Sequence, residues 1–459
     1  MVSFMKKSIL LAVSLAVSIP TVSSAQTLME ALAQTYKTNP VLKADRAQLR
    51  SVDENIALAK SGYRPSVYLQ GSYAEGNTDN RDLPRDYDYD RRTVSANIEQ
   101  PVFRGFRTIN GVRAADSFIR SEQDRFFNSE QEILLSSATS YLDVLRDQAI
   151  VNLQKNNEAL LKKRLDETIE RFNVGEVTRT DVAQARARYS RAQSDRINAQ
   201  GAFEASRAAY VRIIGQEPTI LSEPDNIKSQ LPNTFDEALQ ITIKNNYNVK
   251  QAKNYLKSAI YTVAQNTGEL LPTAGLKGSA SNSKSTADSW VNQDSKADNY
   301  EVSVNMTVPL YSAGESRSRI RQSKYLKWQA QEQVLAAERQ AVETVTSSWE
   351  LMVSNQARIQ SILDQVKASE IALEGVQKEE ALGNRTVLDV LDSYQELLNS
   401  NVEEVKARRD YYVSAMALLL SMGKFTAEDL NLDVELYDPK KHFKKTRDKW
   451  LSTGVDIEN

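Results

Sequence analysis

Two carboxylates, Asp389 and Asp392, stand three residues apart in a segment with the pattern of a helix. This spacing places both side chains on one helix face, about one turn from each other. If several chains surrounded one opening, these side chains would form two stacked rings of negative charge, which concentrate cations and repel anions. The other interpretation is a solvated helix face whose acidic side chains favour initiation near the helix N-terminus. Taken alone, the residues favour this second interpretation.

The remaining reactive side chains do not indicate an enzyme. The sequence contains no cysteine, which excludes thiol catalysis, disulfides and thiolate metal sites, and its single histidine, His442, cannot build a histidine metal site. No nucleophile–base pairing or phosphate-binding glycine loop is visible. Asp389 and Asp392 would suit a hydrolase beside a cleft, whereas they lie in a coiled-coil seam. We therefore predict no catalysis, no cofactor and no functional metal site, although the two aspartates could attract cations.

The sequence repeats itself at a constant offset. Pro, Gly, Asp and Gly at positions 101, 175, 181 and 215 recur 208 positions later, at 309, 383, 389 and 423. A constant offset over such a span indicates two copies of one structural unit. The copies differ after the glycine at 175 or 383. The later copy carries Asp389 and Asp392, whereas the earlier copy carries only Asp181.

Long helices must position these groups. Proline is absent from 102–217 and from 310–438, and apolar residues recur three and four apart, as in a coiled coil. Gly175 and Gly383 interrupt that pattern and are predicted to form turns at the tips of two helical hairpins.

The expected helices differ in length. One of about 60 residues is predicted over 111–172, and shorter ones over 180–213 and 234–267, the last starting at a capping box of Thr234 and Glu237. Two half-length helices placed end to end would match one full-length neighbour. The linker between them should therefore lie at mid-height on a long rod.

Four segments instead alternate with a period of two. The clearest has Val302, Val304, Met306 and Val308 between polar residues, and similar patterns start near 67, 94 and 274. Such strands have one apolar and one polar face. They suit half-buried strands of a soluble sheet, or, at about ten residues each, a transmembrane barrel. Polar turns are expected at 81–90 and 289–294. Four strands cannot close a barrel, whereas three chains would supply twelve and leave a lumen.

The first residues have the form of an export signal. Lys6 and Lys7 precede a short apolar run, and small residues end at Ala25, so we expect a signal peptide over 1–25. Beyond it, no stretch has the roughly 20 apolar residues of a membrane helix. Lys+Arg total 58 against 60 Asp+Glu, which argues against a nucleic-acid partner.

This layout resembles the TolC family of outer-membrane channel-tunnels. The resemblance covers essentially all of the mature chain and is most specific at the two tips, which carry the sequences FNVGEVTRTDV (172–182) and GNRTVLDVLD (383–392). The segment GEVTRTDVAQ at 175–184 and the tail residues 437–450 are similar to the type I secretion branch. The absence of a lipid-attachment cysteine after the signal agrees with that branch.

The resemblance implies a mainly α-helical fold with a β-barrel part. In a homotrimer, each chain would give four strands to a barrel in the lipid of the outer membrane of a Gram-negative bacterium. The long coiled coils would form a helical barrel across the periplasm and narrow to an iris at the tips. A periplasmic adaptor (membrane fusion protein) and an inner-membrane transporter, either an ATP-binding cassette protein or a proton-driven one, would dock there.

The resemblance also implies how the iris closes. An arginine after the tip turn pairs with a Thr-Asp of the neighbouring coil, and the matching residues are Arg385, Thr180 and Asp181. Where the family usually has a tyrosine in this latch, the chain has Glu380. A carboxylate cannot donate to Asp181 at neutral pH. Two alternatives stay open: Arg385 pairs with Glu380, or Arg179 supplies a second cation. With the resemblance, the ring interpretation of Asp389 and Asp392 becomes the favoured one.

The predicted organisation is a signal peptide at 1–25, repeat 1 at 26–230 with strands in 65–103, repeat 2 at 231–430 with strands in 272–311, and a tail at 431–459 near the equator. The predicted function is the exit duct of a tripartite export system. Multidrug efflux and type I protein secretion are both open, and the alternative from another class is a periplasmic coiled-coil adaptor or scaffold.

Overall fold

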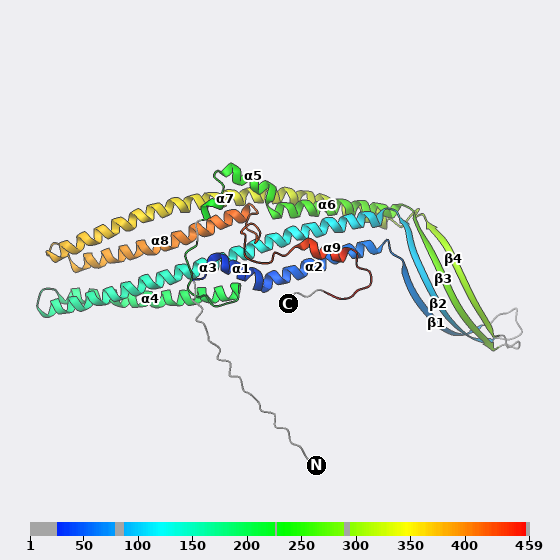
Figure 1. The fold of residues 1–459 in the computed structure, drawn as a ribbon, viewed down its shortest axis with the longest axis horizontal. Coiled ribbons are helices and arrows are strands. Elements are labelled where there is room, and N and C mark those ends of the chain that lie inside the picture. Colours follow the sequence, from blue (N-terminus) through cyan, green and yellow to red (C-terminus); the bar gives the residue numbers. More distant parts are fainter. Residues whose placement is uncertain (1–24, 79–86, 225–226, 289–293, 456–459) are drawn as a thin grey trace, which may run out of the picture.

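The computed structural model describes residues 25–78, 87–224, 227–288 and 294–455. The molecule is elongated, with the tips of two helical hairpins at one end and a β-sheet at the other (Figure 1). Residues 1–24 of the predicted signal, and most of the predicted turns at 81–90 and 289–294, lie outside the described residues.

Most of the described chain is helical. The long helices α3 and α7 have 67 residues each, which corresponds to about 100 Å. The helices are α1 (Leu28–Thr38), α2 (Pro40–Ser61), α3 (Arg107–Asn173), α4 (Arg179–Ile214), α5 (Phe235–Asn245), α6 (Tyr247–Thr267), α7 (Glu315–Ala381), α8 (Val387–Ser421) and α9 (Pro439–Arg447), with short 3-10 turns at Ile227–Gln230 and Gly268–Leu270.

The long helices pack against shorter ones along their whole length. On the tip side α3 lies beside α4, and on the sheet side it lies beside α2 and α6 (Figure 1). In the same way α7 pairs with α8 toward the tip and with α6 toward the sheet. This is the predicted arrangement, in which half-length helices together match a full-length neighbour.

The helix predicted over 234–267 is wrong in one respect, because it is divided at Asn246. The side chain of Asn246 accepts from the amide of Val249, which starts α6, and donates to the carbonyl of Ser421 at 2.9 Å. Asn39 does the same between α1 and α2, where it donates to the carbonyl of Ile213 at 2.8 Å. Each asparagine therefore ends one helix and begins the next. Each also donates to a backbone carbonyl at a helix carboxyl end, Asn39 to that of α4 and Asn246 to that of α8.

The capping box predicted at Thr234 is only half formed. Thr234 accepts from the amide of Glu237 at 3.3 Å, but the Glu237 carboxylate accepts from the amide of Asn233, one residue earlier than a capping box requires. The helix still begins at the expected residue.

The strands form one antiparallel sheet in the order β1-β2-β3-β4. They are longer than the predicted ten residues, because backbone pairing continues past the apolar segments into polar ones, such as the pair Asn77 and Asp88. Asp88–Asp90, predicted as turn, belong to a strand. The strands are β1 (Ser66–Thr78), β2 (Tyr87–Arg104), β3 (Thr273–Asp288) and β4 (Ser295–Thr307).

The register separates an apolar from a polar face of the sheet. Cross-strand neighbours share a face, and one such row is apolar in all four strands: Val67, Ile98, Gly278 and Val302. The next row is polar: Ser66, Glu99, Lys277 and Ser303. The apolar side chains are exposed in the single chain, Val302 at 78% and Val304 at 73%. The predicted alternation is confirmed. β1 and β4 are the edges of this four-stranded sheet within one chain.

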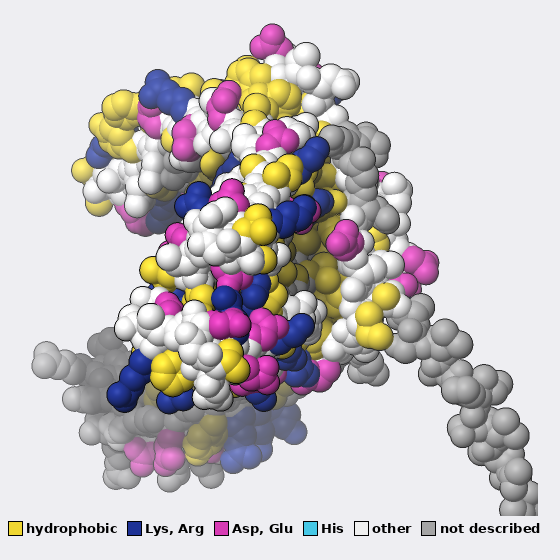
Figure 2. Space-filling model, turned by 90° about the vertical axis from the view of Figure 1, so that its left-hand side faces the viewer, with side chains coloured by type: hydrophobic (Ala, Val, Ile, Leu, Met, Phe, Trp, Pro, Cys, Tyr) yellow, Lys and Arg dark blue, Asp and Glu magenta, His cyan; other side chains and the backbone are white. Residues whose placement is uncertain are grey.

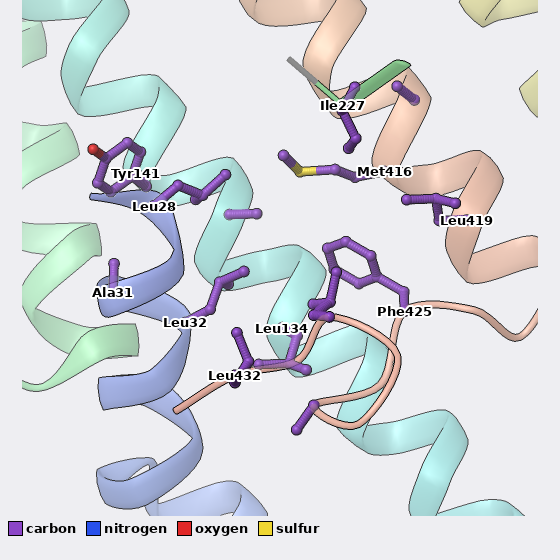
Figure 3. Packing of buried hydrophobic residues seen from close by; sticks show 14 of the residues in the cluster. Leu28, Ala31, Leu32, Leu134, Tyr141, Ile227, Met416, Leu419, Phe425 and Leu432 are labelled. Carbon is purple, nitrogen blue, oxygen red and sulfur yellow. The ribbon is translucent and has the colours of Figure 1, made fainter. Parts of the chain in front are cut away.

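The largest hydrophobic cluster lies at mid-height, where the two repeats meet. Leu28 and Leu32 of α1 pack with Leu134 and Tyr141 of α3 on one side, and Met416 and Leu419 of α8 lie on the other (Figure 3). Phe425 and Leu432, from the chain after α8, fill the space between them (Figure 3). The chain after α8, through Phe425 and Leu432, thus holds the two hairpins together. Among the described helices, none is long and apolar enough to cross a membrane.

The tail continues from this core toward the sheet. Its helix α9 packs on α2, where His442 Nδ1 lies 2.8 Å from the buried carboxylate of Asp53. After α9, Lys449 and Trp450 contact Arg64, two residues before β1. The tail is therefore not confined to the equator.

Candidate functional site

The candidate site is the pair of hairpin tips. The first hairpin, α3–α4, turns at Gly175 (φ 84°), and the second, α7–α8, turns at Gly383 (φ 80°). Both glycines end their helices by the same backbone pattern: Gly175 donates to the carbonyl of Phe172, and the next residue, Glu176, donates to that of Arg171. The left-handed backbone at each position explains the choice of glycine. Both glycines lie at the turns of the hairpins in this structure.

The acidic residue after each turn caps the returning helix. In the second hairpin Asp389 accepts from the backbone amide of Thr386 at 2.9 Å, and Thr386 accepts from the amide of Asp389 at 3.2 Å. The first hairpin has the same box with Thr178 and Asp181. The amide of Thr386 keeps the pKa of the Asp389 carboxyl below its ordinary value. The helix-initiating role considered for Asp389 is therefore present in the structure.

The two hairpins meet above the turns through apolar packing. Leu391 of α8 is 2% exposed and lies among Leu161, Leu165 and Ala185 of the first hairpin. A groove of about 240 Å³ lies beside this contact, lined by residues of α3, α7 and α8 that include Thr168, Arg171 and Glu380. Near the tips the two hairpins thus combine an apolar contact with a groove that polar side chains also line.

Two ion pairs join the hairpins in this zone. Arg171 of α3 contacts the carboxylate of Glu380 on α7 at 2.5 Å, and Arg188 of α4 pairs with Asp392 of α8. The Glu380 side chain is only 10% exposed, and its hydrogen bond raises the pKa of the Arg171 guanidinium above the ordinary value. Because a partly buried pair is screened less than a surface pair, Arg171–Glu380 is the stronger of the two links.

Arg385 has a different partner from those expected. Its guanidinium contacts Glu379 of the same hairpin at 2.9 Å, and both side chains are half exposed. Within the described tips, no hydrogen bond or ion pair joins Arg385 to Thr180, Asp181 or Glu380. Asp181 is engaged by Thr178, and Glu380 by Arg171. In this structure Arg171 and Arg188 supply the cations that join the two hairpins near the tips, in place of Arg385 or the suggested Arg179.

Figure 2 views the molecule from the tip end, where basic and acidic side chains are interspersed. Such a surface can form and break ion pairs between coils. Among the residues that the structure describes, no cluster of three or more acidic or histidine side chains could hold a metal ion.

Sequence reasoning missed several residues of this site. The two caps, Thr178 and Thr386, could have been found, since each stands three residues before an aspartate at a predicted helix start. Arg171 and Arg188 could not, because each is one of many charged residues on a coiled-coil surface and its partner lies in the other repeat.

Comparison with known proteins decides the family. A sequence profile described as "Outer membrane efflux protein" matches residues 28–216 and 238–424. The chain belongs to the outer membrane efflux protein family. The first matched stretch corresponds to repeat 1 and the second to repeat 2. The family pattern therefore includes the strands, the long helices and both tips.

Curated relatives of this family extend over almost the whole chain. The outer membrane efflux protein BepC of Brucella suis is 32% identical over 93% of this chain and 91% of its own length. The outer membrane protein TolC of Escherichia coli is 26% identical over 93% of this chain and 88% of its own length. The alkaline protease secretion protein AprF of Pseudomonas aeruginosa is 25% identical over 76% of this chain and 73% of its own.

Solved structures share the fold. The CmeC outer membrane channel of Campylobacter jejuni superposes with a TM-score of 0.77 at 15% identity, covering 92% of this chain and 89% of that one. The predicted TolC-family membership and fold class are confirmed: long helical coils are joined to a four-strand share of a barrel that trimerisation completes. This family member is an outer-membrane efflux channel whose helices extend into the periplasm, and it is not an enzyme.

Proposed function

We propose that this chain forms the exit duct of a tripartite export system and that its tips are the gate. Three copies would pair β1 with β4 of the next chain to make twelve strands, and their six coils would enclose one passage. A periplasmic adaptor and an inner-membrane transporter would engage the tip end. The observation that carries the gating proposal is the pair of inter-hairpin links, Arg171–Glu380 and Arg188–Asp392, beside the tip turns.

The gate opens, in this proposal, when the two hairpins of each chain separate. Separation breaks both links and exposes Leu391, which is otherwise buried against the first hairpin. The latch of Arg385 with Thr180 and Asp181, implied by the family, remains a second scheme for the closed trimer. In that scheme Arg385 would exchange Glu379 for the Thr-Asp pair of the other coil.

Single-channel conductance of the reconstituted trimer distinguishes the two schemes. Arg171→Ser should raise the closed-state conductance if the Arg171–Glu380 link holds the tips, and Arg385→Ser should raise it if the family latch does. Lys378→Ser is the matched control, because Lys378 pairs with Glu374 on its own helix and joins no coils. If neither arginine variant exceeds the control, these links do not gate the duct.

The aspartates near the tip support a further part of the proposal. In a trimer, Asp389 and Asp392 of three chains would ring the narrow end and attract multivalent cations. Arg188 neutralises part of the Asp392 charge in this structure, so the ring should bind cations more strongly once that pair opens. Replacing both aspartates with alanine should abolish block by multivalent cations from the periplasmic side. Undiminished block would show that they are only a cap and a surface charge.

Two classes of cargo have specific support. Small-molecule efflux is favoured by the 32% identical relative, which is named an efflux protein. Type I protein secretion is favoured by the relative named for alkaline protease secretion and by the resemblance of residues 175–184 and of the tail. The inner-membrane transporter that co-purifies with the tagged chain separates them. A proton-driven drug transporter supports efflux, and an ATP-binding cassette transporter with secretion loss on gene deletion supports protein export.

A further inference from the structure

The end of the tail lies where the helices give way to the sheet. Lys60 Nζ contacts Asp448 at 2.9 Å and the carbonyl of Arg447 at 3.2 Å, and Arg64 donates to the carbonyl of Lys449 at 2.8 Å. Lys60 lies in the last turn of α2, and Arg64 precedes β1 by two residues. These contacts fix residues 447–450 beside the boundary between the helical and β parts.

This boundary is the level of the membrane surface. The β part of the family lies in the outer membrane and the helices extend into the periplasm, so the starts of β1 and β3 mark the periplasmic leaflet. A residue two positions from a strand lies within about 7 Å of its first residue. Groups held by Arg64 are therefore near the lipid headgroups.

The side chains presented at this level have the character of a membrane interface. The Arg64 guanidinium carbon lies over the Trp450 ring, 4.5 Å from the ring centre, yet Trp450 stays 65% exposed. The following Leu451 is 96% exposed, and Tyr63 on the neighbouring turn is 53% exposed. Aromatic side chains with one polar and one apolar edge are enriched at headgroup depth. A leucine so exposed gains most from an apolar contact outside the chain.

The helix before these residues carries positive charge on its outer side. Its inner side, with Pro439 and Thr446, is buried against α2. The outer side bears exposed basic residues: Lys440, Lys441, Lys444, Lys445 and Arg447. A basic helix followed by an exposed Trp-Leu pair is complementary to an anionic lipid surface.

We propose that the tail end, residues 447–451, is a peripheral membrane anchor that binds anionic phospholipid of the periplasmic leaflet. Trp450 and Leu451 insert at headgroup depth, and the basic residues in the last turn of α9, Lys444, Lys445 and Arg447, lie nearest the lipid phosphates. The contact is non-covalent and fixes the tail to the membrane. The proposal concerns the tail alone and is independent of how the tips gate.

The absence of cysteine makes the test direct. Leu451→Cys supplies a unique thiol for an environment-sensitive fluorophore in the full-length trimer, reconstituted into nanodiscs of phosphatidylglycerol and phosphatidylcholine. We expect lipids carrying a headgroup-proximal nitroxide to quench most of the emission at this site. Val174→Cys, 72% exposed at the tip, is the matched control and should not be quenched. Ser452→Cys, exposed and next to Leu451, is the second labelling site should the first variant assemble poorly.

The outcomes separate the possible occupants of this surface. Quenching that falls when phosphatidylglycerol is replaced by phosphatidylcholine, or when Lys444 and Arg447 in the last turn of α9 are changed to Glu, supports the anionic-lipid anchor. Equal quenching in both lipids overturns the anionic part. A blue-shifted emission without quenching means that the neighbouring chain covers the tail, and a water-like emission means a solvated tail; both overturn the proposal. Conductance of the same preparation should be unchanged.

Discussion

Glu130 of α3 is a carboxyl group inside the mid-height core, 2% exposed. It accepts a hydrogen bond from the amide of Ala427 at 2.8 Å, which fixes the chain after α8. Burial, reinforced by Asp429 and Glu428, raises the pKa of this carboxyl from 4.5 to about 7, although the Ala427 amide and Arg46 act in the opposite direction. The packing around Glu130 at mid-height should therefore depend on pH, because this carboxyl group loses its proton near neutral pH.

Replacing Glu130 with Gln should stabilise the protein above neutral pH. The folded state holds the proton more tightly than the unfolded chain, so stability from this group is full below about pH 4.5 and is lost as the pH rises to about 7. The loss is about 3 kcal/mol per chain at most. Gln keeps the acceptor for Ala427 but cannot ionise. As the pH rises from 4 to 8, the thermal unfolding midpoint should therefore fall less in the Glu130→Gln variant than in the unchanged protein.

The control for this prediction is Glu132→Gln, an exposed carboxyl two residues away on the same helix. It should leave the pH dependence of the unfolding midpoint as it is. If Glu130→Gln shows the same slope as the unchanged protein, the Glu130 carboxyl is not buried in the assembled duct.

At the residue scale, the sequence predicted the residues of the turns and helix starts better than it predicted which charged residues pair. Gly175, Gly383 and the acidic residue after each turn were identifiable, because local backbone geometry dictates them. The partner of Glu380 was not, since the choice among Arg171, Arg179 and Arg385 depends on how two coils 200 residues apart in sequence are rotated against each other.

At the scale of elements, glycines with positive φ end the long helices in different surroundings. A Cβ added at Gly175 or Gly383 would meet open space, whereas one at Gly423 would lie 2.6 Å from the carbonyl oxygen of Asn245. The α8 end is thus packed against the junction of α5 and α6, where the Asn246 side chain donates to the carbonyl of Ser421 near the end of α8.

Gly423→Ala should accordingly destabilise the protein much more than Gly383→Ala. At Gly383 only the left-handed backbone is strained, which costs about 1 kcal/mol. At Gly423 the same strain is joined by a backbone clash that must displace α5. We expect a clearly lower thermal midpoint and loss of assembled trimer for Gly423→Ala, with near-normal behaviour of Gly383→Ala. Equal midpoints would mean that the α5–α6 junction yields without cost.

The elements themselves were largely predictable, because periodicity and proline spacing report on long helices and alternating strands. The break at Asn246 was missed because it needs no proline or glycine. A single amide side chain both caps α6 and binds the end of α8, and that second contact is tertiary.

At the scale of the whole molecule, the exposed apolar face of the sheet makes sense only in an assembly. The row Val67, Ile98, Gly278 and Val302 continues across all four strands, and Val304 lies on the same face of β4. Soluble proteins rarely expose so continuous an apolar surface. In the outer membrane this face would contact lipid and the alternate face the lumen.

A charge on the lipid-facing side should therefore prevent assembly where the same charge on the other side does not. Val304→Arg places a guanidinium in lipid, which costs about 2–4 kcal/mol near the membrane midplane and less near its surface. A trimer carries the substitution three times, so we expect little heat-resistant trimer on gels and little protein in the outer-membrane fraction. Ser303→Arg, the neighbouring residue on the polar face, is the matched control and should assemble normally. Should Ser303→Arg abolish assembly and Val304→Arg leave it intact, the two faces of the barrel would be reversed, and a twelve-stranded barrel with a wet lumen could not be built from this register.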